Sequence, residues 1–170
     1  MGIVINLIDA LLFSFFLSIA ILTPLIDAQI CLPHSHTFYP DLLLDATHWY
    51  TNEFGDYLVA EKPDFFVGII WVELLLQWPL ALVNLYGILA SKPWFNTTCL
   101  CYGVSAFTAN IPIIVEMMGS GKATEKMFMM YHAFLGFGVL AILRGFTMRL
   151  FTIKTASSSK RPPLPKKKRI

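Results

Sequence analysis

Three polar side chains interrupt a long apolar stretch, residues 65–90, in the middle of the chain. Glu73, Gln77 and Asn84 are spaced so that all three fall on one face of a helix. The stretch is long enough to cross a hydrocarbon core of about 30 Å, and Pro79 predicts a kink just below the polar face. A carboxyl group inside a membrane costs roughly 2.5–3.5 kcal/mol and normally faces a bundle interior or a cavity. The pattern therefore indicates either a satisfied core acid or a binding pocket, and we favour the pocket.

A second acid, Asp27, lies near the end of the first apolar run, residues 3–31. Counting depth along the predicted helices brings Asp27, Glu73, Thr108 and Tyr131 into the same half of the membrane. Two neighbouring acids in a low dielectric favour sharing one proton, which leaves a single negative charge. Such a pair can receive a cationic amine or exchange a proton with a hydroxyl group. The surrounding aliphatic and aromatic residues suit a flat apolar ligand such as a sterol.

Arg144 is the first of two basic residues inside the last apolar segment, and the same depth count places it far from the acids. It lies about 20 Å along the helix from Tyr131. We therefore expect Arg144 to extend to the cytosolic headgroups together with Arg149, and not to neutralise Asp27 or Glu73.

The composition excludes a soluble domain, because 56% of the 170 residues are hydrophobic and only 14% are charged. The fold class predicted is an all-α membrane protein, a four-transmembrane-helix bundle with a short lumenal helix in the first loop. Residues 1–151 are expected to form this bundle. The four spans are expected at 3–31, 65–90, 98–118 and 127–151.

Residues 152–170 hold seven of the thirteen basic residues and no acid, which predicts a disordered, basic cytosolic tail. Because the excess of positive charge comes from this tail, we expect membrane lipids and not nucleic acid as its surroundings. The scattered histidines and cysteines form no metal-ligand pattern, so no metal is expected. No cofactor is expected either, since the loop 119–126 lacks the glycine spacing of a phosphate-binding loop.

The distribution of lysine and arginine predicts how the chain crosses the membrane. The basic tail and Lys92 belong in the cytosol, so four spans place both termini there. The loops 32–64 and 119–126 then face the lumen, and Pro40 and Gly55 bound the short helix in the first of them. Asn96 opens a glycosylation sequence on the cytosolic side, so we expect it to carry no glycan.

Several segments resemble the sigma-2 receptor family, a branch of the EXPERA (emopamil-binding-like) membrane proteins. The resemblance covers about the first two-thirds of the chain, in the family's order. The segments are PLIDAQICLP (24–33), HWYTNEFGDYL (48–58), WVELLLQWP (71–79) and the Tyr102…Thr108…Ile111-Pro112 pattern.

The resemblance implies a homodimeric protein of the endoplasmic reticulum membrane that binds sterols and cationic amphiphilic amines in a lumen-side pocket. It implies that Asp27 pairs with the amine, that Glu73 shares a proton with Asp27, and that Asp56 supports the site. It further implies that the pocket is lined by Gln77, Trp49, Tyr50 and Tyr131. Ala109 stands where the family pattern has a pocket threonine.

Two other functions remain as alternatives to a non-enzymatic binding protein. The same family includes sterol double-bond isomerases, and a protonated acid beside an ionised one could perform that proton transfer. The isomerase pattern has further acidic and histidine groups on its second and third helices, which this sequence lacks. A structural membrane partner, whose polar residues only hold the bundle together, is the other alternative.

The last residues, PLPKKKRI, predict retention in the endoplasmic reticulum. Lys167 and Lys168 stand fourth and third from the end, which is the spacing of a dilysine retrieval signal bound by a cytosolic coat receptor. We expect Lys167→Ser with Lys168→Ser to release the protein to later secretory compartments, as seen by microscopy of the tagged protein, and Lys166→Ser to change little. Equal, graded effects of all three lysines would instead indicate simple attraction to anionic lipid.

Overall fold

The computed structural model describes residues 2–32 and 35–159, and this part of the chain folds as an all-α membrane bundle. Each of the four spans predicted from the sequence is present as a helix that is long and apolar enough to cross a membrane. The first consists of α1 (Gly2–Leu22), η1 (Thr23–Asp27) and α2 (Ala28–Cys31), and the second of α6 (Asp64–Val72), η2 (Glu73–Gln77) and α7 (Trp78–Leu89). The third is α8 (Phe95–Ser120) and the fourth begins α9 (Glu125–Ser159).

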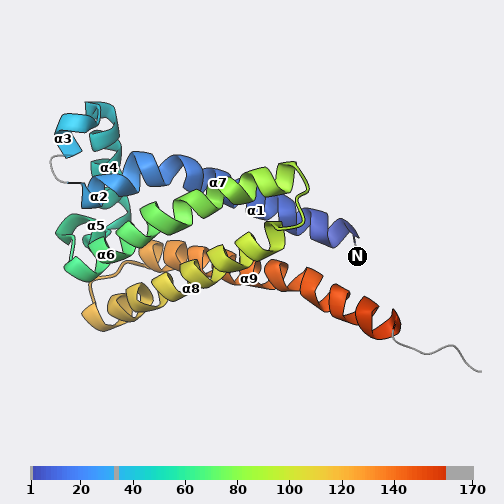
Figure 1. The fold of residues 1–170 in the computed structure, drawn as a ribbon. Coiled ribbons are helices and arrows are strands. Elements are labelled where there is room, and N and C mark those ends of the chain that lie inside the picture. The colour runs from blue at the N-terminus through green and yellow to red at the C-terminus, as the bar shows by residue number, and fades with distance from the viewer. Residues whose placement is uncertain (1, 33–34, 160–170) are drawn as a thin grey trace, which may run out of the picture.

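Three short helices cover the end of the bundle that lies opposite the N-terminus (Figure 1). They are α3 (Ser35–Phe38), α4 (Asp41–Phe54) and α5 (Tyr57–Glu61). The predicted bounds of α4 are confirmed, because Pro40 precedes its first residue and Gly55 ends it in the left-handed conformation at φ +64°. At the other end of the chain, α9 continues past the expected boundary at residue 151 to Ser159. Lys167 and Lys168 lie outside the described residues.

The first and second spans each contain one five-residue π-helical segment, η1 and η2, and each segment carries one of the two predicted acids. Pro24 lies within η1 and Pro79 is the second residue after η2, where the missing N–H of proline favours a break in the α-helical pattern. Carbonyl groups released in a membrane must be satisfied by the protein. In the first span they accept hydrogen bonds from side chains: Trp78 Nε1 to Ala20 O at 3.1 Å, Tyr39 Oη to Pro24 O at 2.8 Å, and Gln29 Nε2 to Leu25 O at 2.6 Å.

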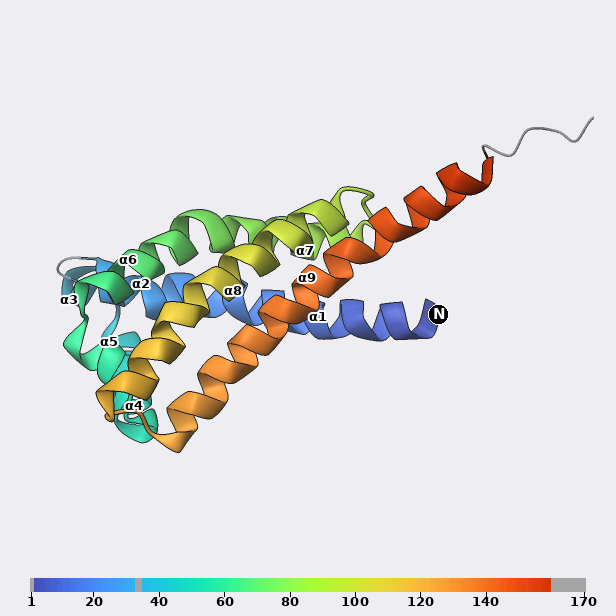
Figure 2. The ribbon, with the colours of Figure 1, turned by 90° about the horizontal axis from the view of Figure 1, so that it is seen from below.

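The third and fourth spans run side by side from the turn that joins them (Figure 2). Gly103 on α8 makes this close approach possible. A Cβ atom at Gly103 would lie 2.7 Å from Gly138 O and 2.7 Å from Ile142 N on α9, where nothing can yield because both atoms are backbone. Gly136, on the same helix as Gly138, has no neighbour within 4 Å of the position where a Cβ would be.

We expect Gly103→Ala to lower the thermal midpoint of the purified protein by several degrees, because the added methyl group forces α8 and α9 apart. The matched control is Gly136→Ala, which meets open space and gains the helix propensity of alanine. Its midpoint should be unchanged or higher. Equal losses in both variants would contradict the assignment of the contact to Gly103.

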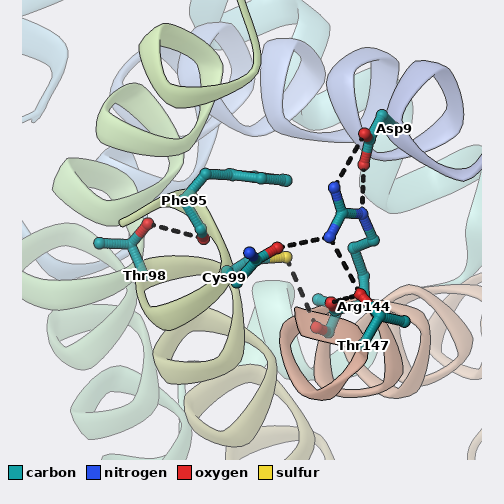
Figure 3. A network of polar contacts seen from close by, with 8 residues as sticks. Asp9, Phe95, Thr98, Cys99, Arg144 and Thr147 are labelled. Atoms are coloured by element: carbon teal, nitrogen blue, oxygen red, sulfur yellow. Dashed lines mark hydrogen bonds and ion pairs between the residues drawn. The ribbon is translucent and has the colours of Figure 1, made fainter. Parts of the chain in front are cut away.

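The expectation that Arg144 extends to the headgroups is wrong, because its side chain is buried. Its Nε and Nη2 atoms donate to the two carboxylate oxygens of Asp9, at 2.6 and 3.0 Å. Its Nη1 atom donates to Asn96 Oδ1 and to Thr147 Oγ1, and its guanidinium lies 5.2 Å from the centre of the Phe95 ring (Figure 3). The cluster connects α1, α8 and α9, so the arginine gains more from these partners than from reaching water.

Breaking this pair from one side should destabilise the bundle more than removing both charges. Asp9→Asn leaves a buried arginine without its counter-charge, which costs about 3–5 kcal/mol in buried pairs, whereas Asp9→Leu with Arg144→Met leaves no charge behind. We expect the single variant to have the lower thermal midpoint. The control is Glu61→Gln, which breaks the Lys122–Glu61 pair; both its side chains are 53% exposed, so the midpoint should hardly change.

Candidate ligand-binding site

A cavity of about 220 Å³ lies inside the bundle, at the end covered by the short helices. Side chains from all four spans and from α4 and α5 line it, and most of them are aliphatic or aromatic. Such a cavity suits an apolar ligand that is held by a few polar groups. Its apolar wall consists mainly of Phe15, Ile19, Leu22, Ile26, Ile30, Val59, Phe66, Ile69, Ile70, Ile113, Met130 and Phe134.

The two predicted acids line this cavity together. Asp27 is the last residue of η1 and Glu73 is the first of η2, so the two π-helical segments bring them to the same space. Thr23 Oγ1, which is fully buried, donates to Glu73 Oε1 at 3.0 Å. Among the residues that the structure describes, no lysine or arginine forms an ion pair with either acid. A negative charge on this pair is therefore left without a protein counter-ion.

Asp56 holds the wall of the cavity in place without lining it. Its Oδ1 accepts from the N–H groups of Leu58 and Val59, at 3.1 and 3.2 Å, which caps α5. Its Oδ2 accepts from the hydroxyl groups of Tyr50 and Tyr131, at 2.8 and 3.1 Å, and both tyrosines line the cavity. Burial raises the pKa of Tyr50, and the neighbouring Asp56 carboxylate raises it further, so this hydroxyl stays a donor. Asp56 thus positions two cavity residues.

The other predicted site residues divide between the cavity and the outer surface. Gln77 lines the cavity, as does Ala109, which stands where the family pattern has threonine. Trp49 does not: it is 64% exposed, because successive helical residues point about 100° apart and Tyr50 faces inward. Thr108 is also exposed and lies on the outer face of α8, next to the lining residues Ala109 and Asn110.

Asn84 is the third member of the polar face predicted on the second span, and it does not line the cavity. It is fully buried and accepts a hydrogen bond from Thr98 Oγ1 on α8, at 2.6 Å. The physical reason is distance along the span, because Asn84 follows Gln77 by two turns of regular α-helix, which keeps it on the same face but about 10 Å farther along the helix.

Thr23 was not predicted as a site residue, although the sequence carried a signal for it. It stands four residues before Asp27, which places it on the same side of a helix. A threonine beside an acid in an apolar run is a natural donor to a carboxylate. In the structure its hydroxyl reaches across to Glu73, so it connects the first span to the second at the site.

The sequence profile described as EBP: EXPERA (EXPanded EBP superfamily) matches residues 42–146, from α4 into α9. This range includes Asp56, Glu73 and Tyr131; Asp27 lies before it.

Similar proteins carry the name Sigma intracellular receptor 2. The one from Xenopus tropicalis is 33% identical over 119 residues, which is 69% of this chain and 68% of the relative. Those from Homo sapiens and Macaca fascicularis are each 33% identical over 108 residues, which is 63% of this chain and 60% of the relatives. The profile covers more than half of the chain, and the four spans are those predicted for that family. The chain therefore belongs to the EXPERA family.

Proposed function

We propose that this protein is an intramembrane binding protein for sterols and cationic amphiphilic amines, with a role in sterol and lipid homeostasis or trafficking. The observation that carries the proposal is the pair of acids, Asp27 and Glu73, in an apolar cavity without a protein counter-ion. A buried charge of this kind requires a partner, and a ligand cation is the partner available. The relatives are named as receptors, which agrees with a binding role.

The ligand amine forms its ion pair with Asp27, and Glu73 keeps the shared proton. Thr23 supports this arrangement, because its hydroxyl donates to Glu73 and fixes that carboxyl group on the side of the first span. Gln77 supplies an amide that can bond a sterol hydroxyl, and the apolar wall accommodates the rings.

The protein resides in the endoplasmic reticulum membrane with both termini in the cytosol, and it forms a homodimer. The lysine and arginine distribution supports this orientation. Asn96, which the orientation places in the cytosol, stays without a glycan; its side chain is 8% exposed and bonded to Arg144. A coat receptor at Lys167 and Lys168 would keep the protein in this membrane.

A binding function explains the residues that line the cavity better than an isomerase function does. Asp27 and Glu73 are the acids among the residues that line the cavity in the described part of the chain, and that lining contains no histidine. The lining therefore lacks the further acidic and histidine groups of the isomerase pattern. Incubating the protein with a Δ8 sterol and looking for a Δ7 product tests this alternative directly.

The proposal predicts that Asp27→Asn reduces the affinity for a tritiated cationic amphiphilic amine by at least about tenfold, because charge-assisted contacts contribute about 1.5–3 kcal/mol. The protein should still insert and purify as a folded bundle. Asp45→Asn is the matched control, since Asp45 is exposed on α4 and does not line the cavity. Unchanged amine affinity in Asp27→Asn would refute the site.

Glu73→Gln should also weaken amine binding and should alter its pH dependence, because it removes the shared proton. Glu116→Gln is the matched control, as Glu116 is exposed on α8 away from the cavity. Affinity is measured by filtration binding across a pH series. If the profile of Glu73→Gln follows that of the unmodified protein at every pH, the two acids are not coupled.

A further inference from the structure

A second pocket lies next to the acid-lined cavity, among α2, α4 and α5, and six of its ten lining residues are polar. Its volume is about 370 Å³, and we call it the loop-side pocket. Thr47 and Thr51 contribute hydroxyl groups, while His48, Asn52 and Lys62 stand at solvent-exposed positions around it. Water can therefore fill this pocket from outside the bundle.

Two apolar residues line both spaces. Ile30 and Val59 belong to the wall of the acid-lined cavity and also to that of the loop-side pocket, and each is 7% exposed. Ile30 follows Asp27 by three residues, so it lies on the acid's side of the first span. The partition between the water-accessible pocket and the acids is thus a single layer of side chains.

The other walls of the cavity give a proton no comparable route. They consist mostly of aromatic and aliphatic side chains such as Phe15, Leu22 and Phe66, beyond which lie other helices or the hydrocarbon of the membrane. Charge crosses such material only at high cost. When the cation leaves, the uncompensated buried charge favours uptake of a proton, and the loop-side pocket is the water-accessible space adjoining the acids.

Val59, one of the two residues of this partition, is also linked to the ligand site by hydrogen bonds through Asp56. The N–H of Val59 donates to Asp56 Oδ1 at 3.2 Å, and the other oxygen of Asp56 accepts from Tyr50 and Tyr131. Both tyrosines line the cavity. A ligand that shifts either tyrosine therefore acts, through one carboxylate, on the backbone of Val59.

We propose that the loop-side pocket is an aqueous vestibule of the acid-lined cavity, and that Ile30 and Val59 form the gate between them. Water passes this gate and relays protons between its molecules, while the bulkier amine does not. Lys62, whose Nζ donates to Gln29 O at 3.3 Å, adds a positive charge to the vestibule. Other titratable groups around the two acids are Tyr102, Tyr131, Tyr50 and Asp56, and His48 faces the vestibule. The purpose of the exchange rests on the proposed function; the existence of the gate does not.

The gate is tested by the water accessibility of a cysteine in the cavity wall. The protein carries Ala109→Cys in a background with Cys31, Cys99 and Cys101 replaced by serine or alanine, and it is held in lipid nanodiscs. The probe is 2,3-dihydroxypropyl methanethiosulfonate, a neutral, water-soluble thiol reagent, and mass spectrometry follows the modification. We expect Ile30→Ala to accelerate the reaction at least about tenfold, because removing the side chain opens the single-layer partition.

Ile113→Ala is the matched control. Ile113 is similarly buried, at 5% exposed against 7% for Ile30, and it lines the cavity but not the loop-side pocket. Its truncation therefore enlarges the cavity without opening the vestibule. Its rate should stay within about twofold of the parent. If either alanine variant fails to fold, the pair Ile30→Val and Ile113→Val replaces it, with the same order of rates.

Thr47→Cys, in the vestibule itself, should react rapidly in every background. Equal rates for Ile30→Ala and Ile113→Ala, or no acceleration by Ile30→Ala, would overturn the gate, and a slow Thr47→Cys would overturn the vestibule. These measurements use no sterol or amine. A gate that opens as expected, together with unchanged amine binding in Asp27→Asn, would refute the proposed function alone.

Discussion

A membrane offers no water to a carbonyl group that has lost its helical partner, and the site of this protein depends on how that requirement is met. Pro24 cannot donate to Ala20 O, and the π-helical turn around it alters the pairing of the neighbouring carbonyls. Side chains restore the hydrogen bonds: Trp78 from the second span and Tyr39 from the loop. The same contacts that satisfy the broken helix therefore also fix where η1 stands, and with it where Asp27 points.

The bundle contains two polar centres that use the same chemistry in opposite ways. At the end near the N-terminus, Asp9 and Arg144 satisfy each other, and Asn96 and Thr147 take further N–H groups of the guanidinium. Nothing in this cluster needs a ligand. At the other end, Asp27 and Glu73 border a cavity and have no ion-pair partner among the described residues. The difference between a structural and a binding centre is whether the protein supplies the counter-charge.

Helix positions and depth could be predicted from the sequence, because hydrophobic length is the dominant signal in a membrane protein. The four spans and the convergence of Asp27, Glu73 and Tyr131 follow from it. The expectation for Arg144 was wrong because it rested only on the distance of Arg144 from those acids. Asp9, which lies at the same depth as Arg144, is its actual partner. A search for opposite charges at equal depth would have found that pair.

The rotation of side chains about the helices was harder to predict, because a π-helical turn adds one residue without a composition of its own. Proline marks the region of each turn but not its register. Glu73 and Gln77 both line the cavity across η2, whereas Asn84, two α-helical turns beyond Gln77 on the same face, lies past the cavity and contacts Thr98. Which positions on α4 and α8 face inward depends on the helices that pack against them. Trp49 and Thr108 lie on faces that no other described helix covers, so both are exposed.

The short helices outside the spans complete the site and do not merely connect it. Asp56 lies between α4 and α5, yet its carboxylate accepts four hydrogen bonds, two from the start of α5 and two from tyrosines that line the cavity. Each donor would be left unsatisfied and buried if the carboxylate moved away. The wall of an intramembrane cavity is thus held by a group of the loop. Because Val59, one of those donors, also borders the loop-side pocket, the position of the loop and the shape of the cavity can only change together.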